Sequence, residues 1–250
     1  MMYPGTGKKV LSTIDCGRGN PFSTPEEILE IARMSITAGS GYVDPIGDPE
    51  LRNSIAESIH RELQLRFDPE QEILVSAGAT PAIAASILAL SDPGDTILVP
   101  DPGWPSYSNI IRAFGRKDYR YRVEPFLREE ALTEIEIIKP KAIILNTPHN
   151  PTGKVLKEED FDRLAILMSR YPDLLILSDE VYNTLVFDAG VHRSPVTHPE
   201  LRHHCVAFRS FSKTHSMPDW RIGFVFGPKS IMQRVESIHR SQGAFPSALA

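Results

Sequence analysis

The chain has 250 residues, of which 41% are apolar and 24% are charged, a composition typical of a globular protein and too apolar for a disordered one. Its net charge of −5, from 27 basic and 32 acidic residues, argues against a broad basic surface for nucleic acid. The only cysteines, Cys16 and Cys205, are too few for a disulfide framework or a four-cysteine metal site, and we predict no metal.

No secretory signal is recognised near the first residues, which lack an apolar core segment. The longest uncharged stretch, 73–91, approaches the length of a membrane span, but Gly78 interrupts its pattern. A buried strand followed by a buried helix explains this stretch better. We therefore expect a cytoplasmic protein.

The predicted elements begin with a turn-rich arm that contains a short helix over 25–38. A second helix is expected to start at Asp48-Pro49 and to end near residue 65. Short apolar strands then alternate with helices. The strands are expected at 73–76, 96–100, 119–123, 141–146, 174–178, 205–210 and 222–226. The helices are expected at 81–90, 106–114, 158–170 and 230–240.

This alternation predicts an α/β fold with a mostly parallel sheet that is covered by helices on both faces. We divide the chain into an N-terminal arm and interface segment, residues 1–44, and a large domain, residues 45–250. Ligands of such sheets bind at the carboxyl ends of the strands. The residues that follow each strand are therefore the first candidates for a functional site.

A candidate anion site follows the first strand, in Ser76-Ala77-Gly78-Ala79-Thr80-Pro81. The pattern predicts a helix with Thr80 as N-cap and Pro81 at its first position. The free amides and the positive end of the helix dipole attract anions. A well-capped helix without any ligand explains the same residues.

Two further loops carry polar or aromatic groups at strand ends. Trp104 lies between prolines after the second strand, where its ring could stack on a flat ligand. Asn150 follows the strand 141–146 in a loop that Pro148 and Pro151 stiffen. Each also has a plain explanation, namely a packed loop tryptophan and an ordinary turn.

Charged side chains follow the next two strands. Asp179 comes directly after 174–178, where a carboxylate must be paired or solvated. Lys213 follows 205–210, and Arg221 lies eight residues further on, so that an amine nucleophile and an anion clamp could lie together. A loop ion pair and two surface cations are the alternatives.

Together, these segments resemble the pyridoxal-phosphate (PLP) aminotransferases of fold type I, in the class I/II group that includes aspartate aminotransferase. The resemblance extends from about Gly17 to the end of the chain. The matching stretches are Gly41-Tyr42-Val43-Asp44-Pro45-Ile46-Gly47 with Glu50-Leu51-Arg52, Ser76-Ala77-Gly78-Ala79-Thr80, Asp92-Pro93-Gly94-Asp95, Asn150-Pro151-Thr152-Gly153, Ser178-Asp179-Glu180-Val181-Tyr182, Ser210-Phe211-Ser212-Lys213 and Trp220-Arg221-Ile222-Gly223.

The resemblance implies a role for each matching residue. Lys213 corresponds to the lysine that links covalently to PLP and moves the substrate proton. Asp179 corresponds to the partner of the ring nitrogen, and Asn150 and Tyr182 to the partners of the ring 3-oxygen. Of these, Lys213, Asp179 and Tyr182 are the expected catalytic residues.

Further positions match the cofactor cup and the substrate side. Trp104 matches the aromatic residue that stacks on the ring. The phosphate cup is expected to comprise Gly78, Ala79, Thr80, Ser210, Ser212 and Arg221, of which Ser212 is the weaker candidate. Gly19, or alternatively Gly17, matches a glycine on the substrate side, where Asn150 is also expected. Tyr42 resembles a tyrosine that reaches the phosphate across a dimer interface, so the resemblance implies a homodimer.

The implied activity is PLP-dependent transfer of an amino group between an amino acid and a 2-oxo acid, with pyridoxamine phosphate carrying the amino group. Two alternatives stay open: a lyase or cyclising synthase on the same fold, and a truncated PLP-binding or structural protein without catalysis. Transfer of the amino group to an added 2-oxo acid separates the first alternative from the leading one.

The sequence departs from the family pattern at three points. Asp219 stands two residues before Arg221, where the family usually has glycine or another small or polar residue. His149 precedes Asn150, which some relatives share. The chain also ends 37 residues after Lys213, whereas family members continue into a small domain with the arginine that binds the substrate carboxylate. We expect this small C-terminal domain to be absent. Arg18 is a conceivable substitute for the missing arginine.

Overall fold

The computed structural model of the chain describes residues 19, 23–38, 43–127, 129–187, 190–243 and 246. The predicted site residue Tyr42 lies outside these residues, as do Gly17 and Arg18. Within the described residues, one sheet has the strand order β1-β7-β6-β5-β4-β2-β3. The strands are β1 (Ile73–Ser76), β2 (Thr96–Asp101), β3 (Lys117–Arg122), β4 (Ala142–Asn146), β5 (Leu175–Asp179), β6 (Cys205–Ser210) and β7 (Gly223–Phe226).

Strand direction determines which residues share an edge of this sheet. Strands β2 to β6 are parallel, whereas β7 is antiparallel to both of its neighbours, β1 and β6. The first residue of β7, Gly223, is therefore paired with Ser76 and Ser210, the last residues of β1 and β6. As a consequence, Arg221 shares an edge with residues that follow the other strands, although it precedes its own.

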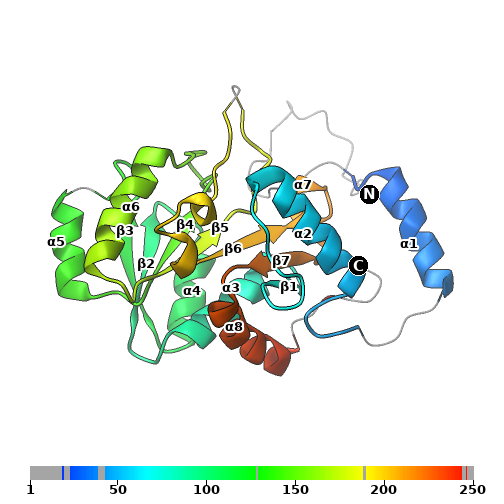
Figure 1. The fold of residues 1–250 in the computed structure, drawn as a ribbon, viewed down its shortest axis with the longest axis horizontal. Coiled ribbons are helices and arrows are strands. Elements are labelled where there is room, and N and C mark those ends of the chain that lie inside the picture. Colours follow the sequence, from blue (N-terminus) through cyan, green and yellow to red (C-terminus); the bar gives the residue numbers. More distant parts are fainter. Residues whose placement is uncertain are drawn as a thin grey trace, which may run out of the picture.

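Helices cover both faces of the sheet (Figure 1). One face packs against α2 (Pro49–Leu63), α5 (Glu129–Ile138) and α6 (Glu158–Arg170). The other face packs against α3 (Ala79–Leu90), α4 (Ser106–Ala113) and α8 (Lys229–Gln242). The predicted α/β fold with a mostly parallel, doubly covered sheet is confirmed.

The remaining elements are short helical segments and one separate helix, α1. Helix α7 (Phe211–Thr214) continues directly from β6, and α1 (Glu26–Ala38) lies at one end of the molecule, beyond α2 (Figure 1). Single 3-10 turns occur at Pro195–Thr197, Arg202–His204 and Pro218–Trp220.

Among the described residues, no helix is long and apolar enough to cross a membrane. The division into an arm and a large domain stays a prediction.

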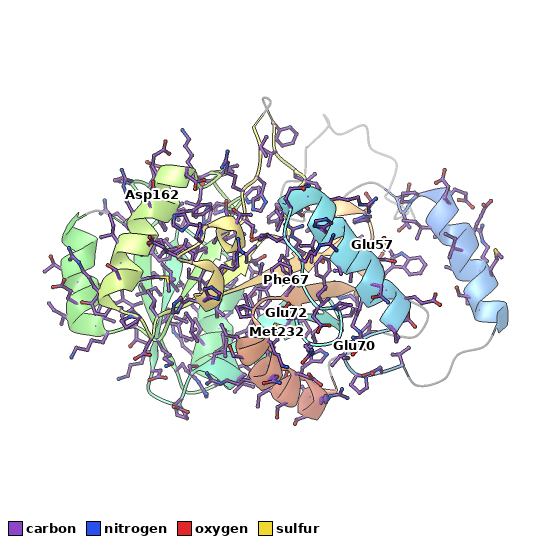
Figure 2. The ribbon with its side chains drawn as sticks, viewed as in Figure 1. Glu57, Phe67, Glu70, Glu72, Asp162 and Met232 are labelled. Atoms are coloured by element: carbon purple, nitrogen blue, oxygen red, sulfur yellow. The ribbon has the colours of Figure 1, made fainter. Side chains whose placement is uncertain are left out.

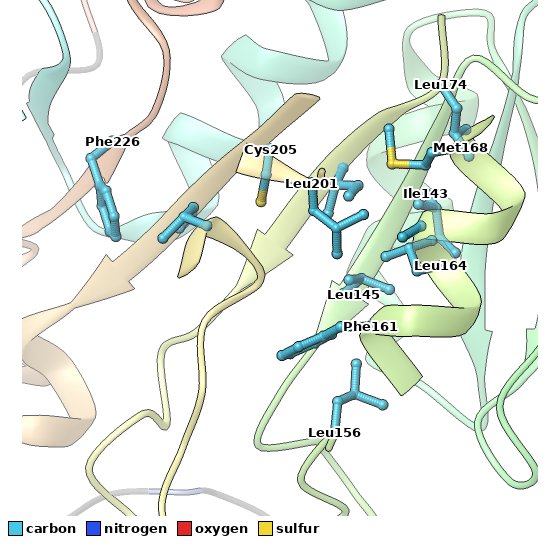
Figure 3. Packing of buried hydrophobic residues seen from close by; sticks show 14 of the residues in the cluster. Ile143, Leu145, Leu156, Phe161, Leu164, Met168, Leu174, Leu201, Cys205 and Phe226 are labelled. Atoms are coloured by element: carbon cyan, nitrogen blue, oxygen red, sulfur yellow. The ribbon is translucent and has the colours of Figure 1, made fainter. Parts of the chain in front are cut away.

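The buried strands contribute side chains to two hydrophobic cores, one on each face of the sheet, because successive side chains of a strand point to opposite faces. In β4, Ile143 and Leu145 join the core beneath α6, whereas Ile144 joins the core on the α3 side. Figure 3 shows the α6 core, in which Phe161 and Leu164 pack over these β4 side chains. Packing in these two cores fixes the strands, and therefore also the loops at their ends, where the site lies.

The polar surface and the apolar interior separate as expected for a globular chain. In Figure 2, Glu57, Glu70 and Asp162 lie on exposed positions, whereas Phe67 and Met232 belong to the interior. The Phe67 ring packs edge-on against that of Phe226, with the centroids 5.0 Å apart and an interplanar angle of 79°.

Every predicted strand and helix is present, with ends that differ by at most two residues. The one difference that affects the site is at α3, which begins at Ala79 with Gly78 as its N-cap. The prediction of Thr80 as N-cap is therefore wrong. Gly78 adopts a φ of 89°, which glycine tolerates without steric cost, so the chain turns into the helix two residues earlier. Pro81 is then in the first turn, where its missing N–H leaves no helical bond unmade.

Replacing Phe161 with Ala should destabilise the fold strongly, because its side chain is fully buried (0% exposed) in the α6 core. The expected loss is about 3–5 kcal/mol in the free energy of unfolding, measured by urea denaturation. Ile166→Ala on the same helix is the control, since Ile166 is 53% exposed and should change stability by less than about 1 kcal/mol. Equal losses for the two variants would contradict the packing described.

Candidate active site

A cavity of about 370 Å³ opens at the edge of the sheet where β1, β5 and β6 end and β7 begins. It brings together most of the predicted site residues. These lining residues are Gly19, Ala79, Thr80, Trp104, Asn150, Asp179, Tyr182, Ser210, Ser212, Lys213 and Arg221. Gly78 adjoins them through Arg221, as described next, while Tyr42 lies outside the described residues.

One end of the cavity has the properties of an anion site. No side chain caps the first turn of α3, where Ala79 and Thr80 line the cavity. A Cβ atom at Gly78 would lie 2.5 Å from an Arg221 guanidinium nitrogen, so only glycine allows the arginine to approach the helix start this closely. The helix dipole, backbone amides and a guanidinium are together well suited to a phosphate group.

The Arg221 backbone itself takes an uncommon conformation. Its φ and ψ are both 53°, in the left-handed region that non-glycine residues seldom adopt and that often marks functional positions. The guanidinium donates to the carbonyl of Pro218 at 3.0 Å. This conformation lets Arg221, two residues before the start of β7, turn its side chain toward the start of α3.

Two serines and the predicted lysine lie beside this end. The Ser210 hydroxyl accepts a hydrogen bond from the Ser212 amide at 3.1 Å, and both side chains are buried at the cavity wall. The Lys213 amine donates to the Gly19 carbonyl. Burial, and then the nearby positive charge of Arg221, lower the pKa of Lys213. The amine therefore loses its proton more readily than an exposed lysine does.

A buried carboxylate occupies another part of the wall. Asp179, the last residue of β5, accepts a hydrogen bond of 2.5 Å from the Tyr107 hydroxyl and one of 3.2 Å from the Val181 amide. Burial raises the pKa of Asp179 to about 6, although both hydrogen bonds act to lower it. A cationic group in the cavity would pair with this carboxylate and restore its ordinary acidity.

Tyr107 also supports the aromatic residue of the site. Its ring packs edge-to-face against Trp104, with the centroids 5.2 Å apart. Tyr107 is thus in contact with both Trp104 and Asp179. Its raised pKa, caused by burial and then by the charge of Asp179, keeps the hydroxyl protonated as a donor.

The loop after β4 is held by Asn146, the last residue of that strand. Its side-chain oxygen accepts the Asn150 amide at 2.7 Å, and its amide nitrogen donates to the Asp179 carbonyl at 3.1 Å. Asn150 in turn donates to the Tyr182 hydroxyl at 3.5 Å. Two side chains from different loops therefore present adjacent polar groups to the cavity.

Sequence reasoning missed Tyr107 and Asn146 as members of the site. Tyr107 follows a predicted strand and Asn146 ends one, yet a tyrosine or an asparagine in such a position does not by itself indicate a site. A tyrosine three residues after Trp104 is equally typical of a packed helix start. Asn146 is recognisable as part of the site only once β4 is seen to pair with β5, because this pairing puts Asn146 opposite Asp179.

Comparison with known proteins identifies the family. The profile of the aminotransferase class I and II family matches residues 15–250. The chain is 35% identical over 228 residues to an aspartate aminotransferase of Pyrococcus abyssi, covering 89% of this chain and 58% of that protein. The chain therefore belongs to the class I and II aminotransferase family, as its motifs predicted.

Solved structures agree with this assignment. The N-succinyldiaminopimelate aminotransferase of Mycobacterium tuberculosis superimposes with a TM-score of 0.88 at 30% identity, over 93% of this chain and 62% of that one. YbdL of Escherichia coli, with an identified methionine aminotransferase function, gives a TM-score of 0.87 at 30% identity, over 94% of this chain and 64% of that one. The chain thus spans about 60% of the length of these relatives.

Asp179→Asn should stabilise the cofactor-free protein at neutral pH. Because burial raises the pKa of the folded carboxyl from 3.8 to about 6, the folded state binds its proton more tightly than the unfolded state. The wild type therefore loses stability as pH rises between about 4 and 6, which amounts to about 3 kcal/mol. The variant should escape this loss, so its advantage should be near zero at pH 4 and full above pH 7.

Urea denaturation across this pH range measures the difference. Asp173→Asn, at an exposed position, is the control and should follow the wild type at every pH. A stability difference between Asp179→Asn and the wild type that does not change with pH would contradict the buried, ionising carboxyl.

Proposed function

We propose that the chain binds PLP in this cavity and transfers an amino group between an amino acid and a 2-oxo acid. Members of its family depend on PLP. The observation that carries the proposal is the convergence of Lys213, Asp179 and Arg221 on one cavity. They supply an amine, a carboxylate and a guanidinium, which suit the aldehyde, the ring nitrogen and the phosphate of PLP.

The residues present fit this cofactor in further respects. The uncapped start of α3 and the close approach of Arg221 to Gly78 leave donors for a phosphate. Asp179 is buried without a cationic partner among the described residues, which suits the protonated nitrogen of a pyridine ring. Trp104 offers an aromatic face at the cavity wall, and Asn150 and Tyr182 offer polar groups for the ring oxygen.

When bound, PLP supplies an electron sink that stabilises negative charge at the substrate Cα. Asp179 would hold a proton on the ring nitrogen, because a buried carboxylate favours a positive charge beside it. The Tyr107 hydroxyl would keep the Asp179 carboxylate in place by donating to its Oδ2.

Lys213 would act as the base that moves the Cα proton. An ordinary lysine is protonated at neutral pH and cannot accept a proton, whereas burial and Arg221 lower the pKa of Lys213. Arg221, Ser210 and the first amides of α3 would hold the phosphate and fix the cofactor along the cavity. Gly19 lies against the lysine, since a Cβ atom at Gly19 would be 3.1 Å from the amine, so a larger residue at this position would crowd the amine.

The substrate stays open within this reaction class. The relatives are named as aminotransferases of aspartate, methionine and N-succinyldiaminopimelate, which are chemically diverse. We therefore propose the reaction class and not one amino acid. A homodimer in which Tyr42 reaches the partner's cofactor, and a cytoplasmic location, are proposed on the family resemblance alone.

Lys213→Ala should abolish turnover while noncovalent PLP binding persists. The test reconstitutes the chain with PLP and follows the absorbance of the bound cofactor on adding mixed amino acids and then a 2-oxo acid. The wild type should change its absorbance band and regain it, whereas the variant should be slower by at least about 10²-fold. Lys117→Ala, at an exposed position on β3, is the control and should behave as the wild type.

Each contrary outcome has its own meaning. Substantial multiple turnover by Lys213→Ala would overturn the assigned role of the lysine. A wild-type band that changes with amino acids but is not restored by any 2-oxo acid would favour a lyase or synthase. A band that ignores every amino acid would favour a cofactor-binding protein without aminotransferase activity.

A further inference from the structure

An ionic network lies directly behind the cavity wall, with most of its members buried and one, Glu62, partly exposed. The Arg209 guanidinium contacts the Glu62 carboxylate at 2.6 Å and the Glu180 carboxylate at 3.1 Å. Glu180 is fully buried (0% exposed), and Arg209 is buried as well. Asn183 joins the network by donating to Glu62 at 3.4 Å. We call these four residues the Arg209 clamp.

The clamp is adjacent in sequence to the predicted cofactor residues. Glu180 follows Asp179, Asn183 follows Tyr182, and Arg209 precedes Ser210. The three neighbours thus belong to three segments of the cavity wall, namely the end of β5, the loop after it and the end of β6. Glu62 adds the last turn of α2, which packs on the face of the sheet opposite α3.

The pairing of β5 with β6 connects the clamp to the residues that line the cavity. Asp179 is paired with Phe208 across β5 and β6, and the Glu180 amide donates to the Phe208 carbonyl at 2.8 Å. The side chains of Asp179 and Ser210 line the cavity. Because neighbouring residues of a strand point to opposite faces, Glu180 and Arg209 meet on the other side. Their ion pair therefore joins the ends of β5 and β6 on the face of the sheet opposite the cavity residues.

The bonding within the clamp is dense enough to fix both charged groups. The Glu180 carboxylate accepts hydrogen bonds from the hydroxyls of Ser178 at 3.0 Å and Ser194 at 2.5 Å, in addition to those of Arg209. The guanidinium also lies 5.4 Å from the Phe226 ring centroid. Buried networks whose members are all bonded make the surrounding backbone rigid.

We propose that Arg209 is a positioning residue, which through Glu180, Glu62 and Asn183 holds the strand ends carrying Asp179, Tyr182 and Ser210 in the arrangement that PLP requires. This inference rests on the proposed PLP site. Arg209 itself does not line the cavity. Its substitution should therefore change how the cofactor is held, and not only how stable the fold is.

Arg209→Met tests this proposal, because methionine keeps much of the side-chain volume and removes the charge and the donors. The matched control is Arg116→Met. Arg116 is also buried and donates to Ser91 and Phe114, but it precedes β3 at the opposite edge of the sheet. Both variants should lower the thermal unfolding temperature. Only Arg209→Met should weaken PLP binding, by about 10- to 100-fold, as loss of a supporting hydrogen-bond partner does at metal sites.

The readouts are the dissociation constant for PLP, measured by equilibrium dialysis, and the visible circular dichroism of the bound cofactor at saturation. Arg209→Met should reduce the dichroic signal, because its size depends on how asymmetrically the ring is held. Arg209→Lys keeps the charge and a single donor nitrogen but loses the planar fork, so it should recover part of both the affinity and the signal.

Wild-type affinity and dichroism in Arg209→Met, or equal changes in Arg116→Met, would overturn the proposal and leave the clamp with a purely stabilising role. If Arg209→Met does not fold, Glu62→Gln serves as the test variant instead. Glu62 is partly exposed, and its substitution removes only the ion pair between Arg209 and α2. Unchanged cofactor binding and dichroism in that variant would count against the clamp. Failure of the wild type to bind PLP would instead refute the proposed function.

Discussion

The carboxylate of Asp179 is buried among the strands and Tyr107, and an ionised group in that position is stable only beside a positive charge. Two hydrogen bonds are too few to offset this burial, so the pKa rises to about 6 in the absence of a cation. The fold therefore retains a group that weakens it at neutral pH. A ligand with a cationic ring nitrogen would relieve this cost, which links the stability of the protein to occupancy of the site.

The direction of β7 determines the rest of the site. A wholly parallel sheet would carry the residues before its last strand to the far edge, away from the other loops. Because β7 runs antiparallel to β1 and β6, Arg221 lies beside the start of α3 and close to Lys213. The guanidinium can then contribute to an anion site and also lower the pKa of the lysine. The reversed direction of β7 therefore places one guanidinium where it can both bind an anion and lower the pKa of Lys213.

Much of the fold was predictable because apolar runs and turn residues specify strands and helices locally. The bounds of β6 and α6 agree with the prediction, since each is a clear pattern between polar residues. The start of α3 was not predictable, because the left-handed conformation of Gly78 outweighs the capping tendency of Thr80. Helix α5 was missed, although its segment Glu129–Ile138 is rich in glutamate, a good helix former.

The site was predictable where a residue type carries its own chemistry, as with Lys213, Asp179 and Arg221. It was not predictable where the contribution comes from pairing in space. Tyr107 and Asp179 are 72 residues apart, and Glu62 and Arg209 are 147 apart, so no local pattern joins them. Tyr42, which the family resemblance assigns to a partner's site, stays a prediction.

The most direct test of the central claim is to identify the lysine to which PLP becomes attached. Sodium borohydride makes the reversible link between PLP and an amine permanent, and peptide mapping by mass spectrometry then locates it. We predict one modified lysine at a stoichiometric amount of PLP, in the peptide that contains Lys213. Modification of other lysines with Lys213 left free, or no stable attachment, would contradict the proposed site.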